Sequence, residues 1–304
     1  MAAPPLIAEA VVQAVERLAR FRDQTAVVKL GGSAMEDPAA TDACLRSVAV
    51  LNRVAIPIVL VHGGGKPIDR AMAEAGLTPK KVAGRRHTDD AALAIVARVL
   101  GDINRDLARR LKSLGVESSA MIDTDHFPLE GSLLRLDDSD GKPIDLGWVG
   151  SVSDVDVEGL LSWRLKECGE VPVIPSLASF AGSPSGWLNV NADTAAAAVA
   201  GALQAEKAIF LTDTPGVLRD RNDPASLLPR LTEQECRALI AAGVIEGGMV
   251  PKVEACFEAL AAGAKSALIL DGREPFSLLD VFLNDAFTGT EIQRTEDRGQ
   301  KSVF

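Results

Sequence analysis

Short apolar runs with strand character alternate with longer helical patterns along most of the chain, and this alternation restricts the fold more than any other feature. The apolar runs are 25–30, 56–62, 171–175, 207–213 and 266–271, and helical patterns occupy 66–76, 89–114, 193–203, 232–242 and 251–262. Strands that alternate with helices form βαβ units, and uninterrupted apolar strands are typical of sheets covered on both faces. The sequence therefore predicts an α/β fold, a three-layer αβα sandwich around a mainly parallel central sheet.

Two segments depart from this alternation. Residues 123–155 are richer in Asp, Gly and Ser and contain the turn sequence DDSDGKP, so we interpret them as β-hairpins that leave the sheet. Residues 6–21 place apolar side chains at helical spacing, which predicts an amphipathic helix. No low-complexity linker divides the chain, so any two lobes are expected to share one continuous sheet.

Composition excludes several classes of protein. The chain has 304 residues, enough for one large or two medium domains, and 47% of them are apolar. Its formal net charge of −10 argues against a nucleic-acid binder, which needs a basic face. No apolar run reaches the roughly 18 residues of a membrane span, and no basic region precedes the first helix as in a secretory signal. A cytoplasmic enzyme that binds neither nucleic acid nor membrane is expected.

The four cysteines fit the same cellular environment. They form no C-x-x-C pair and stand in apolar or helical patterns, so buried, reduced thiols are expected. They are Cys44, Cys168, Cys236 and Cys256.

Four segments join small residues to the start of a helix: VVKLGGSAMEDP, VHGGGKP, NVNADT and GGMVPKVEA. The second is neither of the two common phosphate motifs. Leu60 and Pro67 break the P-loop pattern, and Ile68 replaces the last glycine of the dinucleotide fingerprint. Consecutive glycines nevertheless bring backbone N–H groups close to an anion, and a helix N-terminus adds positive potential. Together the segments predict a phosphate-binding site.

Isolated charged residues stand at these loops. Lys29 interrupts an otherwise apolar strand, which places its amine in a buried or cleft-facing position, and Lys252 opens a helix after two glycines. Asp193 is expected to be the N-cap of an alanine-rich helix. The three histidines lack H-x-x-x-H spacing and no G-x-S-x-G occurs, which argues against a zinc site and against that type of hydrolase. This set favours phosphoryl transfer to a carboxylate, which needs no general base at neutral pH.

In its order of motifs, the chain resembles amino-acid kinases, and among them the acetylglutamate kinases, from about residue 25 to residue 290. The resemblance is carried by VVKLGGSAM, VLVHGGGKPID, GRRHTDD, DINRDL, DLGWVGSV, LNVNADTAA, LTDTPGVL and GGMVPKVEAC. It implies ATP-dependent phosphorylation of the side-chain carboxylate of N-acetyl-L-glutamate to N-acetyl-L-glutamyl 5-phosphate, the second step of arginine biosynthesis. It also implies Mg²⁺ held mainly by the phosphates of ATP, with no metal site made of side chains.

The resemblance further implies roles for individual residues. The implied catalytic residues are Lys29, Lys252 and Asp193, with the aspartate orienting both lysines. The implied substrate-binding residues are Gly64, Gly65, Arg86, Asn189 and Asn191. The implied phosphate- and ATP-binding residues are Gly31, Gly32, Asp213, Gly216 and Gly248. Arg86 is expected to grip a substrate carboxylate, whereas Lys66 of VHGGGKP is expected to be secondary.

The resemblance also implies a division of the chain into three parts. Residues 1–24 would form an oligomerisation helix, residues 25–200 would form a lobe that binds acetylglutamate and dimerises, and residues 201–304 would form a lobe that binds ATP. A homo-oligomer is expected, either a dimer or a hexamer built as a trimer of dimers, because arginine-inhibited members carry such a helix. Arginine inhibition itself stays open. Phe276 stands at the histidine position of the inhibitor site, and Asp280 or Val281 at its glutamate position.

Two departures from the family pattern leave alternatives. The segment MIDTDHFPLEGSL lacks the first glycine of an S-G-x-D-G-like pattern, and His87 replaces a small aliphatic residue. A kinase for another acidic amino acid or a carrier-linked analogue is therefore one alternative. The other is a catalytically inactive amino-acid sensor on the same fold, which the presence of Lys29, Asp193 and Lys252 disfavours.

Overall fold

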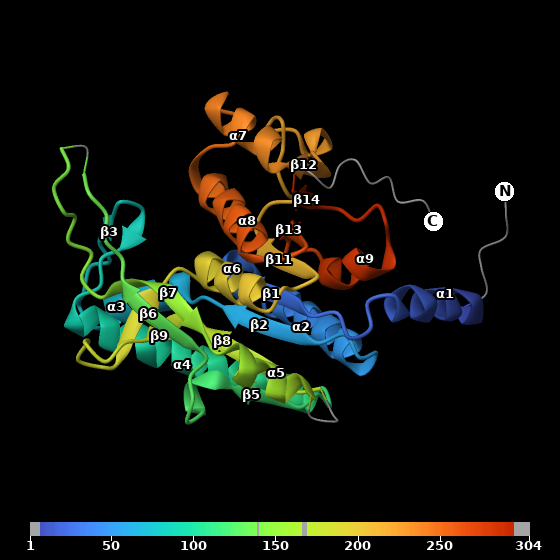
Figure 1. The fold of residues 1–304 in the computed structure, drawn as a ribbon, viewed down its shortest axis with the longest axis horizontal. Coiled ribbons are helices and arrows are strands. Elements are labelled where there is room, and N and C mark those ends of the chain that lie inside the picture. The colour runs from blue at the N-terminus through green and yellow to red at the C-terminus, as the bar shows by residue number, and fades with distance from the viewer. Residues whose placement is uncertain (1–6, 139, 166–168, 295–304) are drawn as a thin grey trace.

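The structure of the protein, a computed structural model, describes residues 7–138, 140–165 and 169–294, and gives the backbone alone for residues 33 and 162–165 (Figure 1). The helices are α1 Ile7–Ala19, α2 Pro38–Arg53, α3 Gly65–Glu74, α4 Asp90–Ser113, α5 Val157–Leu165, α6 Ala192–Ala202, α7 Glu233–Ala241, α8 Val250–Ala262 and α9 Ser277–Leu283. The strands are β1 Ala26–Leu30, β2 Ile58–His62, β3 Lys81–Val82, β4 Arg85–Arg86, β5 Ser118–Ala120, β6 Leu129–Leu133, β7 Val149–Val155, β8 Val171–Pro175, β9 Leu177–Ser179, β10 Trp187–Val190, β11 Lys207–Thr212, β12 Arg230–Thr232, β13 Ser266–Asp271 and β14 Thr290–Gln293.

The central sheet has eight strands in the order β12-β14-β13-β11-β1-β2-β8-β5. Every neighbouring pair is parallel except β13 and β14, so the prediction of a mainly parallel sheet is confirmed. The chain builds outward from β1 on one side before residue 200 and on the other side after it. One continuous sheet thus spans both halves of the chain, and the strand order reverses at β1, the position where ligands bind in open α/β sheets.

Alternate side chains of each strand enter two different cores, which gives the molecule three layers. In β1, Val27 packs in the core formed with α6 and α8, whereas Val28 packs in the core formed with α2, α4 and α9. The predicted αβα sandwich is therefore confirmed. Lys29 follows Val28 on the same side of the sheet as Val27, which directs its side chain toward the layer of α6 and α8.

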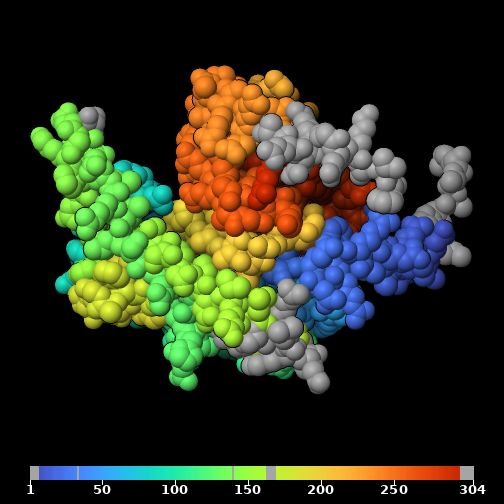
Figure 2. Space-filling model, in the orientation of Figure 1, coloured from blue at the N-terminus to red at the C-terminus, as the bar shows by residue number. Residues whose placement is uncertain are grey.

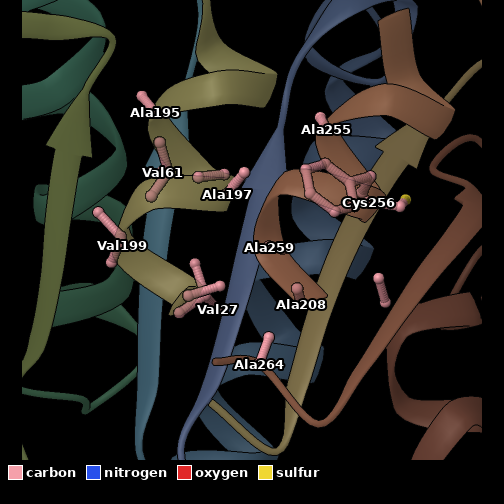
Figure 3. Packing of buried hydrophobic residues seen from close by; sticks show 14 of the residues in the cluster. Val27, Val61, Ala195, Ala197, Val199, Ala208, Ala255, Cys256, Ala259 and Ala264 are labelled. Atoms are coloured by element: carbon pink, nitrogen blue, oxygen red, sulfur yellow. The ribbon is translucent and has the colours of Figure 1, made fainter. Parts of the chain in front are cut away.

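Helices α6 and α8 pack closely because their facing surfaces consist of small residues. Figure 3 shows Ala195 and Ala197 of α6 and Ala255 and Ala259 of α8 in the core over the sheet. A Cβ atom on Gly201 would lie only 2.2 Å from Cβ of Ala262, so any larger residue there would push the helices apart. This close packing helps to set the first turns of the two helices beside each other.

A second, small sheet closes on itself in the order β10-β7-β6-β9. Its strands β6 and β7 form an antiparallel hairpin, as predicted for residues 123–155. The connecting residues project as an arm that stands apart from the C-terminal part of the molecule (Figures 1 and 2). A bridge between Thr88 and Gly147 ties the base of the arm to the segment after β4.

The first helix, α1, extends away from the body of the molecule (Figure 1). Among its side chains Leu18 is buried, whereas Ile7, Val11, Val12 and Val15 are exposed. The predicted amphipathic helix is thus present, with most of its apolar face open to solvent in the single chain. In the part of the chain that the structure describes, no helix has the length and apolar character of a membrane span.

Three of the four cysteines are buried and free, as expected: Cys44, Cys236 and Cys256. Burial raises the pKa of the Cys44 and Cys236 thiols to about 12, so both stay protonated at neutral pH. Cys168 lies outside the described residues.

Candidate active site

A cavity of about 230 Å³ lies at the carboxyl ends of β1 and β2, next to the start of α6. It brings together most of the residues that the sequence predicts as a site. Those that line it are Lys29, Gly31, Gly32, Gly64, Gly65, Arg86, Asn189, Asn191 and Asp193. They come from β1, the two glycine loops, the β3–β4 hairpin, β10 and α6, so residues more than 160 positions apart in the sequence share one cavity.

Two lysines approach the carboxylate of Asp193. Lys29 lines the cavity together with Asp193, whereas Lys252 is not among the described residues that line it. Lys29 Nζ lies 2.9 Å from Asp193 Oδ1, and Lys252 Nζ, at the start of α8, lies 3.8 Å from Oδ2. Burial alone would raise the pKa of Asp193, but the charges of Lys29 and Lys252 outweigh burial and hold that pKa below its usual value. Asp193 is therefore a carboxylate at neutral pH and lies between two ammonium groups.

The prediction that Asp193 caps α6 is wrong, because Asn191 is the N-cap. The Asn191 side-chain oxygen accepts hydrogen bonds from the backbone N–H groups of Asp193 (2.8 Å) and Thr194 (3.1 Å). Asp193 instead lies in the first turn of the helix and is almost completely buried. Since Asn191 satisfies the helix end, the carboxylate of Asp193 is free to pair with the lysines.

Two glycines of these loops, Gly31 and Gly64, have neighbours too close for a side chain, whereas Gly32 is favoured by its backbone conformation. A Cβ atom on Gly31 would lie 2.9 Å from Lys29 Nζ, and one on Gly64 would lie 2.9 Å from Cδ2 of Leu100. Gly32 has a φ of +63°, which side-chain-bearing residues rarely adopt. Gly64 and Gly65 begin α3, where the backbone N–H groups have no intrahelical partner and can bind an anion.

The predicted carboxylate clamp is already held in place. Arg86 forms an ion pair with Asp69 and donates a hydrogen bond to the Gly65 carbonyl at 3.2 Å. The buried hydroxyl of Thr88 donates to the Arg86 carbonyl (2.8 Å) and accepts from Nδ2 of Asn189 (3.0 Å). Thr88 thus couples the two residues that are predicted to hold the amino-acid substrate.

Comparison with known proteins agrees with this arrangement. The model of the amino acid kinase family matches residues 24–271. The chain belongs to the amino acid kinase family.

Curated relatives within this family are named acetylglutamate kinase. The chain is 39% identical over 294 residues to that of Akkermansia muciniphila, with 95% of this chain and 96% of the relative covered. It is 40% identical to that of Synechococcus elongatus, with 92% and 90% covered. It is 37% identical to that of Symbiobacterium thermophilum, with 94% and 97% covered.

Solved structures support the same fold. N-acetylglutamate synthase from Neisseria gonorrhoeae, solved with coenzyme A and N-acetyl-glutamate, matches with a TM-score of 0.78 and 24% identity. The match covers 95% of this chain and 64% of the synthase, so the synthase contains a part that this chain does not match. Carbamate kinase from Giardia lamblia bound to AMP-PNP matches with a TM-score of 0.61 and 16% identity, covering 90% of this chain and 99% of the kinase.

Three predicted nucleotide-binding residues of this amino acid kinase do not line the cavity. Asp213 is exposed in the loop after β11, where it accepts a hydrogen bond from the Thr212 hydroxyl at 3.1 Å. Gly216 packs against β14, since a Cβ atom there would lie 2.6 Å from Oγ1 of Thr290. Gly248 lies in the turn before α8 with open space around it. Their roles in binding ATP stay predictions.

Sequence reasoning missed two polar residues of the cavity, Arg85 and Ser176. Ser176 directly follows β8, so the rule that ligands bind at the carboxyl ends of parallel strands could have found it. Arg85 precedes Arg86 in GRRHTDD, where the second arginine carried the family resemblance. His87, by contrast, lies 3.8 Å from Asp145 of the arm and is not among the described residues that line the cavity. Lys66 pairs with Glu36 and is not among the described residues that line the cavity, and its secondary role stays a prediction.

A second cavity of about 570 Å³ lies beside α9. Its lining includes Asp271, Arg273, Phe276 and Asp280. Of the positions where the resemblance raised the question of an inhibitor site, Phe276 and Asp280 thus line this cavity, whereas Val281 is not among its lining residues. Within the described ranges, no three His, Cys, Asp or Glu side chains converge as they would around a metal ion.

Proposed function

We propose that this amino acid kinase phosphorylates the side-chain carboxylate of N-acetyl-L-glutamate with ATP and yields N-acetyl-L-glutamyl 5-phosphate and ADP. The observation that carries the proposal is the pair of lysines held by one buried aspartate beside two glycine loops. The curated relatives named acetylglutamate kinase, matched over nearly their whole length, support the choice of acceptor.

The proposed reaction needs no proton transfer. An oxygen of the acceptor carboxylate attacks the γ-phosphorus of ATP, the bond from that phosphorus to the bridging oxygen of ADP breaks, and an acyl phosphate forms. Negative charge develops on the transferring group and on the leaving oxygen. Lys29 and Lys252 stabilise this charge, and each positioned donor in a water-poor site contributes about 3–4 kcal/mol.

Asp193 keeps both lysines oriented. Two close ammonium groups without a counter-ion would repel each other, and the carboxylate between them offsets this repulsion. The N–H groups of Gly64 and Gly65 would bind the transferring group, which is supported by their position at a helix start that lines the cavity. Arg86 and Asn189 would hold the amino-acid part of the acceptor.

ATP would lie between this cavity and the loop after β11. The Thr214 hydroxyl in that loop is buried without a hydrogen-bond partner in the described part of the chain, so a polar group of the nucleotide would complete it. Mg²⁺ would enter with the nucleotide, held mainly by phosphate oxygens, and would neutralise part of their charge.

An acceptor screen tests the proposal. ADP release would be measured with N-acetyl-L-glutamate, L-glutamate, L-aspartate and carbamate, and acyl phosphate would be trapped with hydroxylamine. We expect ADP and hydroxamate in equal amounts with N-acetyl-L-glutamate and little of either with the others. A clear preference for a different acceptor would favour the kinase for another acidic amino acid, and binding of N-acetyl-L-glutamate without ATP consumption would favour the inactive sensor.

We also propose that the chain forms a homo-oligomer through α1. Its exposed Ile7, Val11, Val12 and Val15 form an apolar face that a single chain leaves open. Light scattering of the full chain, and of Val11→Glu and Val15→Glu together, tests this. The expected result is a smaller assembly for the variant, and an unchanged mass would remove α1 from the interface.

A further inference from the structure

His62 and Asn104 form a buried pair beneath the second glycine loop. His62 ends β2, directly before Gly63, and both side chains are completely inaccessible to solvent. His62 Nε2 lies 3.0 Å from Asn104 Nδ2, and His62 Nδ1 lies 3.0 Å from the Gly63 carbonyl oxygen. Neither residue lines the cavity, so neither can touch a substrate there.

The surroundings of Asn104 set which way its amide points. Its Nδ2 donates to the Val173 carbonyl at 2.8 Å, and its Oδ1 accepts from the Ile122 N–H at 3.3 Å. A flipped amide would lose both bonds. The second hydrogen of Nδ2 therefore points at His62 Nε2, which must accept it and carry no proton. The remaining proton of the neutral ring lies on Nδ1 and is donated to the Gly63 carbonyl.

This hydrogen bond sets the plane of the next peptide. In a trans peptide the C=O and N–H bonds point in opposite directions, and no described peptide of the chain is cis. A Gly63 carbonyl directed at the buried His62 ring therefore turns the Gly64 N–H away from it, and Gly64 lines the cavity. Gly63 is also held on its other side, because its N–H donates to the Leu30 carbonyl, next to Lys29, at 3.1 Å.

We propose that His62, kept in its neutral Nδ1–H form by Asn104, is a positioning residue that directs the Gly64 N–H at the transferring phosphoryl group. The identity of that group rests on the proposed function. Protonation of His62 would remove the acceptor that Asn104 requires, and burial opposes it by lowering the pKa of His62 to about 4, against a small rise from the bond to Gly63.

Steady-state kinetics of Asn104→Leu test the proposal. Leucine has nearly the same size but no hydrogen-bond donor. The neutral His62 ring can then carry its proton on Nδ1 or on Nε2, and the peptide between Gly63 and Gly64 is no longer held in one orientation. We expect kcat to fall about 10- to 100-fold, as for other partners that orient a ligand-binding group, with the KM values for both substrates within about twofold. Asn52→Leu is the matched control, because it removes a side-chain bond to the Gly169 carbonyl away from the cavity. The control is expected to keep the wild-type kcat.

The protonation state of the His62 ring is measured by ¹⁵N NMR of the full chain, labelled at its three histidines. The variants His87→Gln and His126→Gln assign the signals to individual histidines. The proposal predicts a neutral His62 protonated on Nδ1 at pH 7, and a mixture of forms in Asn104→Leu. A wild-type ring protonated on Nε2 or on both nitrogens would overturn it, even if the variant did not fold. A folded Asn104→Leu with a changed ring but an unchanged kcat would overturn it too. If wild-type protein did not phosphorylate N-acetyl-L-glutamate, the proposed function would fail while the ring measurement would still test the position of the proton.

Discussion

Lys29 and Lys252 approach the same carboxylate from different halves of the chain, but their surroundings differ. Lys29 lies within the central strand β1, with 8% of its side chain exposed and its Nζ 2.9 Å from Asp193. Lys252 lies in the first turn of α8, with 21% exposed and its Nζ 3.8 Å away. One lysine is in direct contact with the carboxylate in the free protein, whereas the other is slightly apart and more open to water.

The surroundings of the two lysines are stabilised by different interactions. On the Lys29 side, a central strand, the bond from Gly63 to Leu30 and the buried His62–Asn104 pair hold the backbone. On the Lys252 side, the position of the lysine depends on the packing of α6 against α8 through small residues. We therefore expect the Lys29 side to tolerate less change in shape than the Lys252 side.

The largest effect is expected when the shared carboxylate is removed. Asp193→Asn keeps the volume but leaves two close cations without a counter-ion, so that they repel each other and lose their fixed orientation. We expect kcat to fall by about 10³-fold or more, since each lost donor costs about 10²–10³. Asp42→Asn, at an exposed position of α2, is the control that should keep full activity. A loss of less than about tenfold in Asp193→Asn would mean that the two lysines act independently of Asp193.

A smaller and unequal effect is expected when each lysine is replaced by arginine. Arginine keeps the charge but has a larger, planar head group. Lys29→Arg should lower kcat about 10²-fold or more, because Gly31 and Asp193 already crowd its Nζ. Lys252→Arg, with more open surroundings, should lose about tenfold. Equal losses, or a larger loss at Lys252, would show that the Lys29 side is not the more sensitive of the two.

Acid should lower the free energy of unfolding by protonating His62, which lies on the Lys29 side. Its pKa is about 4 in the folded chain and 6.5 is its ordinary value, so between these values the unfolded chain binds the proton more strongly. The contribution of neutral His62 is thus complete above about pH 6.5 and is lost as the pH falls toward 4, by at most about 3 kcal/mol. Urea unfolding at several pH values should show this loss in wild type and not in His62→Gln. Parallel pH profiles of the two proteins would contradict it.

The smallest effect is expected from a change in the packing on the Lys252 side. Gly201→Ala places a methyl group against Ala262, and overpacking of this kind costs about 1–3 kcal/mol of unfolding free energy. Because α8 must shift, kcat should fall while the affinity for N-acetyl-L-glutamate stays the same. Ala238→Val, on an exposed position of α7, is a control for the added volume. Reduced affinity with unchanged kcat in Gly201→Ala would place the disturbance on the other side of the cavity.

Much of the fold and half of the site could be predicted because they depend on local pattern. Apolar runs between helical segments predict strands such as β1, β2, β8, β11 and β13, and parallel strands place their following loops at one edge. A charge inside an apolar strand and glycines after it then point to Lys29 and its loop. These signals need no knowledge of which strands are neighbours.

The rest depends on contacts between distant residues. Asn191 and Asp193 are both good helix caps, and the sequence alone does not decide between them. His62 and Asn104 are 42 positions apart, and their pairing follows from the packing of α4 beside β2 and β8. Arg85 and Arg86 are adjacent, and sequence reasoning assigned a role to only one of them. The short elements α5, α9 and β14 were not predicted either, since each offers only a brief pattern.

³¹P NMR of the reaction mixture would show whether the two lysines of this protein support phosphoryl transfer to a carboxylate. With the chain, ATP, Mg²⁺ and N-acetyl-L-glutamate, we expect the γ-phosphate signal to be replaced by equal amounts of ADP and an acyl phosphate. The acyl phosphate should be absent when the acceptor is omitted or when Asp193→Asn is used. Formation of ADP and inorganic phosphate from the first moment, with no acyl phosphate and no hydroxamate when hydroxylamine is added as a trap, would show that the phosphoryl group goes to water and not to the carboxylate.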